Sequence, residues 1–83
     1  MLNQANPYNP YNPKIPINDH KGTKVAYSYN GVVYAIPGQN VGTLRGGNIY
    51  GLDGQLLGRL TPRGVVVCED GSVSETFLRL AAG

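Results

Sequence analysis

The side chains best suited to proton transfer or nucleophilic attack are a single histidine, His20, and a single cysteine, Cys68. A general base needs a partner that orients it and a nucleophile that it serves. His20 has only its neighbours Asp19 and Lys21, in a stretch that favours a turn. Cys68 follows an apolar run and is not flanked by the cations that activate thiols. We therefore expect an exposed turn histidine, a half-buried strand cysteine, no catalytic residue and no enzymatic activity.

Two aspartates, Asp53 and Asp70, stand at equivalent positions of an internal repeat and could contribute to a ring of carboxylates that binds calcium. The two remaining equivalents are Lys21 and Pro37, which would break the ring. Hairpin turns use aspartate for their own backbone geometry, and one Cys with one His is a poor zinc set. No metal and no other cofactor is expected.

Two tyrosines and two arginines are the candidate ligand-binding residues: Tyr34, Tyr50, Arg45 and Arg59. The tyrosines share a repeat position and could stack on a base or a sugar, and the arginines could bind an anion or an acidic partner. Cross-strand packing of the tyrosines and a solvated rim of arginines explain the same residues without a ligand. A ligand site, if present, is expected on the symmetry axis or between chains.

These residues are positioned by a repeat of 16 to 17 residues that runs from about position 31 to 79. Each unit has a glycine followed by strand-forming residues, then a turn with a second glycine, then an alternating return strand. The leading glycines are Gly31, Gly47 and Gly64, and the turn glycines are Gly38, Gly54 and Gly71. A degenerate first copy begins at Ile15 and turns at residues 19–22. The pattern predicts an all-β fold, a small pseudo-four-fold repeat of β-hairpins of about 16 residues each, closed or nearly closed.

Two positions of the repeat are expected to pack inside the body. In the first strand of each unit, one position is filled by Ile17, Val33, Ile49 and Val66. In the return strand, one position is filled by the small residues Ala26, Gly42 and Gly58, as expected where another backbone approaches closely. In the last unit Glu75 takes this second position. The spacing Ser72 to Glu75 is that of a capping box, so a short helix at about 73–82 competes with a return strand, and both remain open.

The N-terminal residues 1–14 are expected to form an extended arm that precedes a β domain at 15–83. Residues 6–13 repeat Asn-Pro-Tyr, and proline at every third position favours an extended backbone without a strand ladder. Such a segment is either a disordered terminus or a docking arm whose tyrosines lose little entropy on binding. In the second case the partner-binding residues are Pro7, Tyr8, Pro10, Tyr11 and Pro13.

Composition narrows the function classes. The net charge is +2 and the basic residues are scattered along the chain, so nucleic acid is a possible partner but not a favoured one. No apolar run is long enough to span a membrane, and the start lacks the features of a signal peptide. We expect a cytoplasmic protein, or one built into a particle assembled in the cytoplasm. A body of this size with a single cysteine has a marginal core and no internal disulfide, which favours self-association.

The repeat resembles the bacterial four-fold β flower family over about residues 15–79. The residues that carry the resemblance are Asp19, Gly22, Val25, Ala26, Tyr27, Ile49, Tyr50, Gly54, Leu57, Gly58, Asp70 and Gly71. The resemblance implies a pseudo-four-fold β fold, and it implies no activity or catalytic residue.

Two functional hypotheses follow. The first is a non-enzymatic structural or interaction module that self-associates or docks on a larger assembly, such as a phage virion or a bacterial particle, through its N-terminal arm. The alternative is a module that binds a small ligand or nucleic acid, for example a phage-encoded factor acting against a host system.

Overall fold

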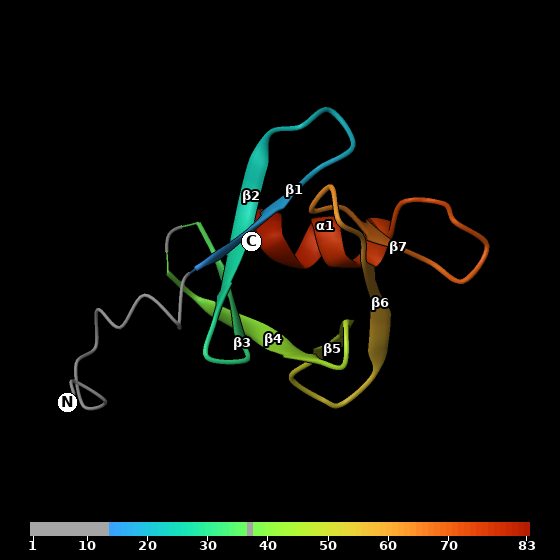
Figure 1. Cartoon of the computed structure of the whole chain (residues 1–83). Coiled ribbons are helices and arrows are strands. Elements are labelled where there is room, and N and C mark those ends of the chain that lie inside the picture. The colour runs from blue at the N-terminus through green and yellow to red at the C-terminus, as the bar shows by residue number, and fades with distance from the viewer. Residues whose placement is uncertain (1–13, 37) are drawn as a thin grey trace, which may run out of the picture.

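The computed structural model describes residues 14–36 and 38–83. Within these residues, seven strands form one antiparallel sheet in which each strand pairs with the next along the chain, and a helix follows (Figure 1). The elements are β1 (Ile15–Asn18), β2 (Lys24–Tyr29), β3 (Val32–Ala35), β4 (Asn40–Arg45), β5 (Asn48–Gly51), β6 (Leu56–Leu60), β7 (Val66–Val67) and α1 (Glu75–Ala82). The predicted all-β repeat of hairpins is confirmed.

Two kinds of turn alternate along the sheet. Five turns share one hydrogen-bond pattern: the N–H of the first residue donates to the carbonyl four residues later, and the carbonyl of that first residue accepts from the N–H three residues later. These turns start at Asp19, Ala35, Gly51, Thr61 and Cys68. We call the four that start at Asp19, Ala35, Gly51 and Cys68 the long turns. The short turns, Asn30-Gly31 and Gly46-Gly47, have positive φ at both central residues, at 53° and 79° and at 57° and 83°. This is the type I′ geometry that matches the twist of paired strands.

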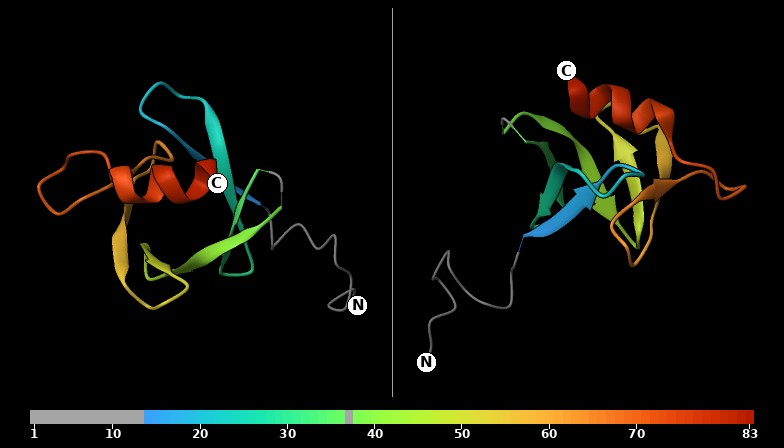
Figure 2. Two further views of the ribbon diagram at one scale, coloured as in Figure 1. Left: turned by 180° about the vertical axis from the view of Figure 1, so that it is seen from behind. Right: turned by 90° about the horizontal axis from the view of Figure 1, so that it is seen from above.

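The two kinds of turn define two ends of the body. Because successive strands run in opposite directions, the four long turns gather at one end, and the short turns and the turn at 61–65 lie at the other. The helix α1 lies with the long turns, where it shares grooves with Asp19 and His20, with Ile36 and Gln39, and with Leu52, Asp53 and Gln55. We call this the helix end and the opposite one the base end. The right-hand view of Figure 2 shows α1 at one end of the strands.

The sheet nearly closes on itself. The backbone N–H of Asn18, the last residue of β1, donates to the carbonyl of Gly64 at 2.7 Å, and its side-chain Nδ2 donates to the carbonyl of Arg63 at 3.3 Å. Asn18 and Val65 form a parallel bridge. These contacts join the first strand to the segment that leads into β7.

The core lies on the axis of this ring. The four equivalent first-strand positions, Ile17, Val33, Ile49 and Val66, are all buried. Ala26, Gly42 and Gly58 are their partners across the first three hairpins. A Cβ on Gly58 would lie 2.7 Å from the carbonyl oxygen of Val67, so the predicted close approach of a backbone is confirmed.

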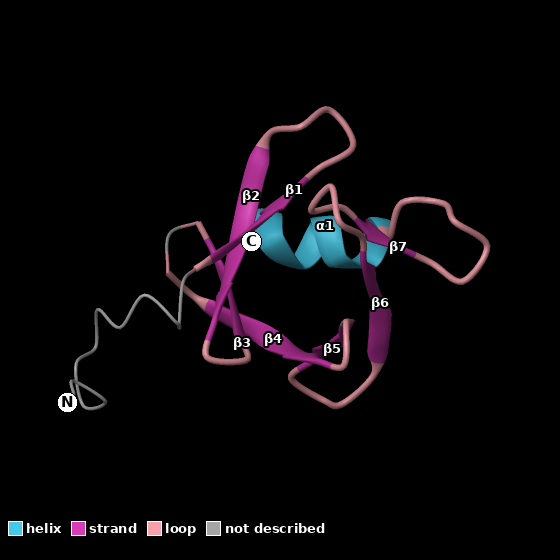
Figure 3. Ribbon diagram, viewed as in Figure 1, coloured by secondary structure: helices cyan, strands magenta, loops and turns pink. Residues whose placement is uncertain are grey.

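The fourth unit departs from the hairpin pattern after its turn. After this turn, Val73 forms a single antiparallel β-bridge with Val67, and the chain then forms α1 instead of a return strand. The return strand is disfavoured because Glu75 stands at the repeat position that Gly42 and Gly58 occupy in the earlier units. A side chain at that position of a return strand would collide with the neighbouring backbone. The helix alternative is therefore the correct one (Figure 3).

The cap of this helix is not the predicted one. The side chain of Ser74, not Ser72, accepts the hydrogen bond from the N–H of Phe77, and Ser72 instead donates to Asp70 in the preceding turn. Phe77, on the first turn of α1, is fully buried and fills the helix end of the ring.

Candidate interaction surfaces

The isolated histidine and cysteine lie as expected. His20 is exposed in the first long turn, and Cys68 is half-buried with a free thiol at the end of the β7 segment. Among residues 14–36 and 38–83, no group of three or more His, Cys, Asp or Glu side chains is arranged to hold a metal ion.

The turn aspartates are engaged by their own turns. The carboxylate of Asp19 accepts from the N–H groups of Lys21 and Thr23, each at 2.9 Å, and the N–H of Thr23 is the main cause that lowers the pKa of Asp19. The hydroxyl and N–H of Ser72 lower the pKa of Asp70 in the same way, at 2.7 and 3.0 Å. Asp53 accepts from the N–H of Gln55. Turn geometry therefore accounts for all three carboxylates.

Three of the four candidate ligand-binding residues lie together on the outside of the sheet. Asn48 is the cross-strand partner of Arg45 on one side and of Arg59 on the other, so the three side chains share one face. The guanidinium carbon of Arg45 lies 5.0 Å from the centroid of the Tyr50 ring, a cation–π contact.

The fourth candidate residue, Tyr34, lies in a different cluster. Its ring stacks on that of Tyr27 at a centroid distance of 5.2 Å, and the Lys14 ammonium lies 5.1 Å from the Tyr27 ring centroid. Tyr34 and Tyr50 each alternate with buried core residues, so they face outward, away from the axis. The expected cross-strand packing of tyrosines is found, and these side chains do not meet on the symmetry axis.

Charge is divided between the two ends of the body. The base end carries four cations, Lys14, Arg45, Arg59 and Arg63, and none of the described carboxylates. The other three cations (Lys21, Lys24 and Arg79) and all five carboxylates (Asp19, Asp53, Glu69, Asp70 and Glu75) lie in the long turns, beside them or on α1. The base end therefore holds +4 and the helix end −2, which together give the net charge of +2.

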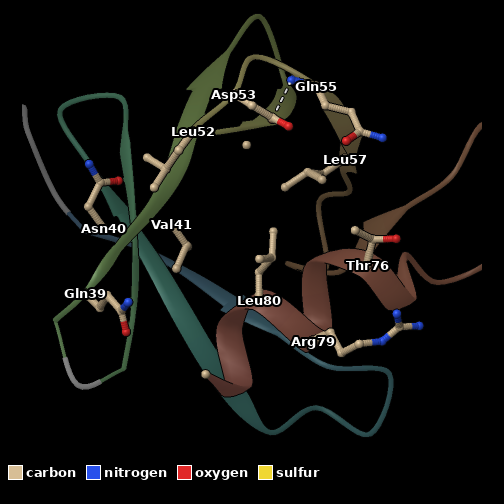
Figure 4. A pocket seen from close by; sticks show the side chains of 12 residues that line it. Gln39, Asn40, Val41, Leu52, Asp53, Gln55, Leu57, Thr76, Arg79 and Leu80 are labelled. Carbon is tan, nitrogen blue, oxygen red and sulfur yellow. Dashed lines mark hydrogen bonds between the residues drawn. The ribbon is translucent and has the colours of Figure 1, made fainter.

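An apolar groove of about 700 Å³, called groove 1, runs between α1 and the residues at 39–41 and 51–57. Val41, Leu57 and Leu80 point into it, and Leu52 stands on its far rim (Figure 4). Polar residues surround this floor: Gln39, Asn40, Asp53, Gln55, Thr76 and Arg79. Leu52 is 71% exposed and Leu80 is 42% exposed, large apolar side chains that a partner could cover.

A smaller groove of about 410 Å³, called groove 2, flanks the other side of α1. Its apolar residues include Ile36 and Leu78, but its lining also carries the charged or titratable side chains of Asp19, His20 and Lys24. Both grooves therefore combine apolar residues with a pair of oppositely charged ones, Asp53 and Arg79 in groove 1 and Asp19 and Lys24 in groove 2.

The sequence did not reveal either groove, because both depend on where α1 lies across the ring. One signal was present. Leu52 is a large apolar residue beside the Asp53-Gly54 turn, where turn chemistry favours polar residues. The partner-binding residues predicted in the arm, Pro7 to Pro13, lie outside the described residues, as does Pro37. No described helix has the length and apolar character needed to cross a membrane.

The comparisons with known proteins agree with this architecture. The sequence profile of the family described as 4-fold beta flower protein matches residues 3–73. The match covers the three complete hairpins and the fourth long turn, and ends just before α1. It begins inside the expected arm. Neither the curated proteins nor the solved structures contain a match. The matched segment spans more than half of the chain, which therefore belongs to the 4-fold beta flower family.

Proposed function

We propose that this chain is a non-enzymatic interaction module that self-associates or docks on a larger assembly, such as a phage virion or a bacterial particle, with its N-terminal residues as the docking arm. The observation that carries the proposal is groove 1, where Leu52 and Leu80 remain 71% and 42% exposed beside a floor of core residues. Exposed apolar surface bordered by polar side chains is typical of sites where proteins bind one another.

The size of the body supports the same proposal. Fewer than 70 residues form the described sheet and helix, and the central aliphatic positions are small or medium in size. A core of this size contributes little stability beyond what the chain loses in entropy, and association with a partner is a common support. Residues 1–13 of the arm have no charged side chain and three prolines, which suits an extended segment that binds an apolar groove.

The test is the solution mass of the full chain and of a chain lacking residues 1–13, measured by light scattering after size exclusion over a range of concentrations. We expect a full chain that associates and a truncated chain that remains a folded monomer. A full chain that stays monomeric at every concentration, with no partner captured from a host assembly, would contradict the proposal.

A second function, binding of an anionic ligand or nucleic acid, is favoured by one observation. The fold gathers Arg45, Arg59 and Tyr50 on one outward face at the base end, although these residues are scattered in the sequence. The test is fluorescence anisotropy of a labelled single-stranded oligonucleotide in low salt, with Arg45→Ala/Arg59→Ala compared with Lys21→Ala/Lys24→Ala. Binding that is lost only in the first pair would support this function.

A further inference from the structure

The described chain begins at Lys14, and this point and groove 1 lie at opposite ends of the body. The strand β1 begins at Ile15 and leads into the first long turn after Asn18, so the chain enters the sheet from the base side. Groove 1 lies at the helix end, between α1 and the long turns. An arm that continues the direction of β1 therefore points away from the groove of its own copy.

Local sequence favours this continuation. Proline at positions 13 and 16 biases the preceding residues, Asn12 and Ile15, to extended conformations and disfavours a tight reversal. In an extended polyproline-type conformation residues 1–13 of the arm span roughly 40 Å, whereas a strand of four to six residues spans about 13 to 20 Å. The arm is long enough to pass beyond the base end and along the body of a neighbouring copy.

The charges of the two ends are complementary. The base end carries four cations, and the helix end carries five carboxylates against three cations. Two base ends would repel each other, as would two helix ends, while the base end of one copy attracts the helix end of another. The opposite charges therefore favour a head-to-tail contact, which joins different ends of two copies, over a two-fold symmetric contact, which joins the same end of both.

The chemistry of groove 1 also matches the arm better than groove 2 does. Residues 1–13 of the arm offer prolines, tyrosines and asparagines without a charged side chain. Groove 1 offers an aliphatic floor with the amide side chains of Gln39, Asn40 and Gln55 at its edge. Amides can hydrogen-bond the backbone carbonyls of an extended segment, while the tyrosine rings cover the exposed leucines. Each groove also has one acidic and one basic side chain, but groove 2 is smaller, at about 410 Å³ against about 700 Å³, and has no amide side chain in its lining.

We infer that copies of this chain associate head to tail, with the N-terminal arm of one copy bound in groove 1 of the next. This inference rests on the proposed self-association and specifies its partner, surface and direction. The base end of the first copy then faces the acidic long turns of the second.

The experiment is a complementation between two variants that each lose one half of the contact. The first lacks residues 1–13 and keeps groove 1. The second, Leu52→Gln/Leu80→Gln, keeps the arm and has a polar groove. Both substituted leucines are exposed, so the fold is expected to persist, and neutral glutamine leaves the charge of the helix end unchanged. Leu56→Gln is the matched control, because Leu56 is 57% exposed but does not line groove 1.

We expect each defective variant alone to be a folded monomer, with self-association weakened at least tenfold, and the mixture of the two to form a one-to-one dimer that grows no further. The full chain and Leu56→Gln are expected to form species larger than a dimer, because a head-to-tail contact either continues or closes into a ring. Raising the salt from 50 to 500 mM should weaken the full-chain contact severalfold.

The outcomes separate the inference from the function on which it rests. A full chain that is monomeric throughout overturns the head-to-tail inference, and it overturns the proposed function as well when no partner is captured from a host assembly. A full chain that associates, with a mixture that does not pair, overturns the head-to-tail inference alone, as does a full chain that stops at a dimer. Circular dichroism of each variant identifies any that has failed to fold, and in that case the single substitution Leu52→Gln replaces the double one.

Discussion

The hydroxyl of Ser74 donates a 2.7 Å hydrogen bond to the carbonyl oxygen of Leu57, seventeen residues earlier in the chain. The same hydroxyl oxygen accepts from the N–H of Phe77 at 3.3 Å, so one buried side chain both caps α1 and attaches it to β6. The position of the helix across the ring, and with it the shape of groove 1, depends on this residue.

Replacement of Ser74 by alanine removes the cap and leaves the Leu57 carbonyl without this donor. We expect Ser74→Ala to lower the free energy of unfolding by about 2 kcal/mol and to reduce the helical signal in circular dichroism. Urea denaturation measures the first effect. Thr76→Ala is the control, since Thr76 is exposed on the same helix and lies outside the cap. An unchanged midpoint for Ser74→Ala would contradict this role.

Substitution of Gly42 by alanine tests the close approach between neighbouring hairpins. A Cβ at this position would overlap the carbonyl oxygen of Tyr50 on β5. We expect Gly42→Ala to destabilise the protein by about 1 to 3 kcal/mol, the usual cost of overpacking, as measured by urea denaturation. Thr43→Ala, at the adjacent exposed position, should change the stability by less than half as much. Equal effects at both positions would show that the slot is not sterically closed.

Acid should weaken the protein through the aspartates of the long turns. The pKa of Asp19 and that of Asp70 lie below the ordinary value of 3.8 in the folded protein. Their contribution to stability is therefore complete above the unfolded pKa and is lost as the pH falls through the lower folded value. We expect Asp70→Asn to be less stable than the parent at pH 7 and to approach it in stability as the pH falls below 3.8 and through the lowered pKa of Asp70. Urea midpoints between pH 7 and 2 measure this, with the neighbouring Glu69→Gln as control.

Closure of the ring depends on Gly64. Its φ is 86°, and a Cβ there would lie 3.0 Å from the side-chain nitrogen of Asn18 and 3.1 Å from the carbonyl oxygen of Pro16. We expect Gly64→Ala to cost about 1 to 2 kcal/mol and to expose the Asn18 amide, which donates to the Gly64 carbonyl. Hydrogen exchange of that amide is the measurement. Exchange that stays as slow as in the parent would rule out this role for Gly64.

The repeat made much of the fold predictable. Turn glycines at Gly22, Gly54 and Gly71 all have positive φ, as their sequence context requires, and the four aligned positions that begin with Ile17 are all buried. These features depend on a few neighbouring residues or on the alternation of inward and outward side chains along a strand, and both can be recognised in a sequence.

The fourth unit and the surfaces were harder to derive. The sequence showed that Glu75 breaks the glycine pattern, but two serines compete as helix caps, and only the packing of Phe77 under the ring selects Ser74. The unequal charge of the two ends could be derived only once the direction of every strand in the sheet was known. Groove 1 depends in addition on the docked position of α1, which is a tertiary property with no local signature.

The sequential order of the strands has a consequence for the time course of folding. Every strand pairs with its neighbour along the chain, so hairpins can form within microseconds through short loops. The contact between Asn18 and Gly64 is different, because five strands, β2 to β6, lie between these two residues in the sequence. During synthesis, β1 leaves the ribosome with an unpaired outer edge that persists until Gly64 and Val65 follow. Closure is therefore expected to be a late step, and the edge of β1 is where pairing between incomplete chains would begin.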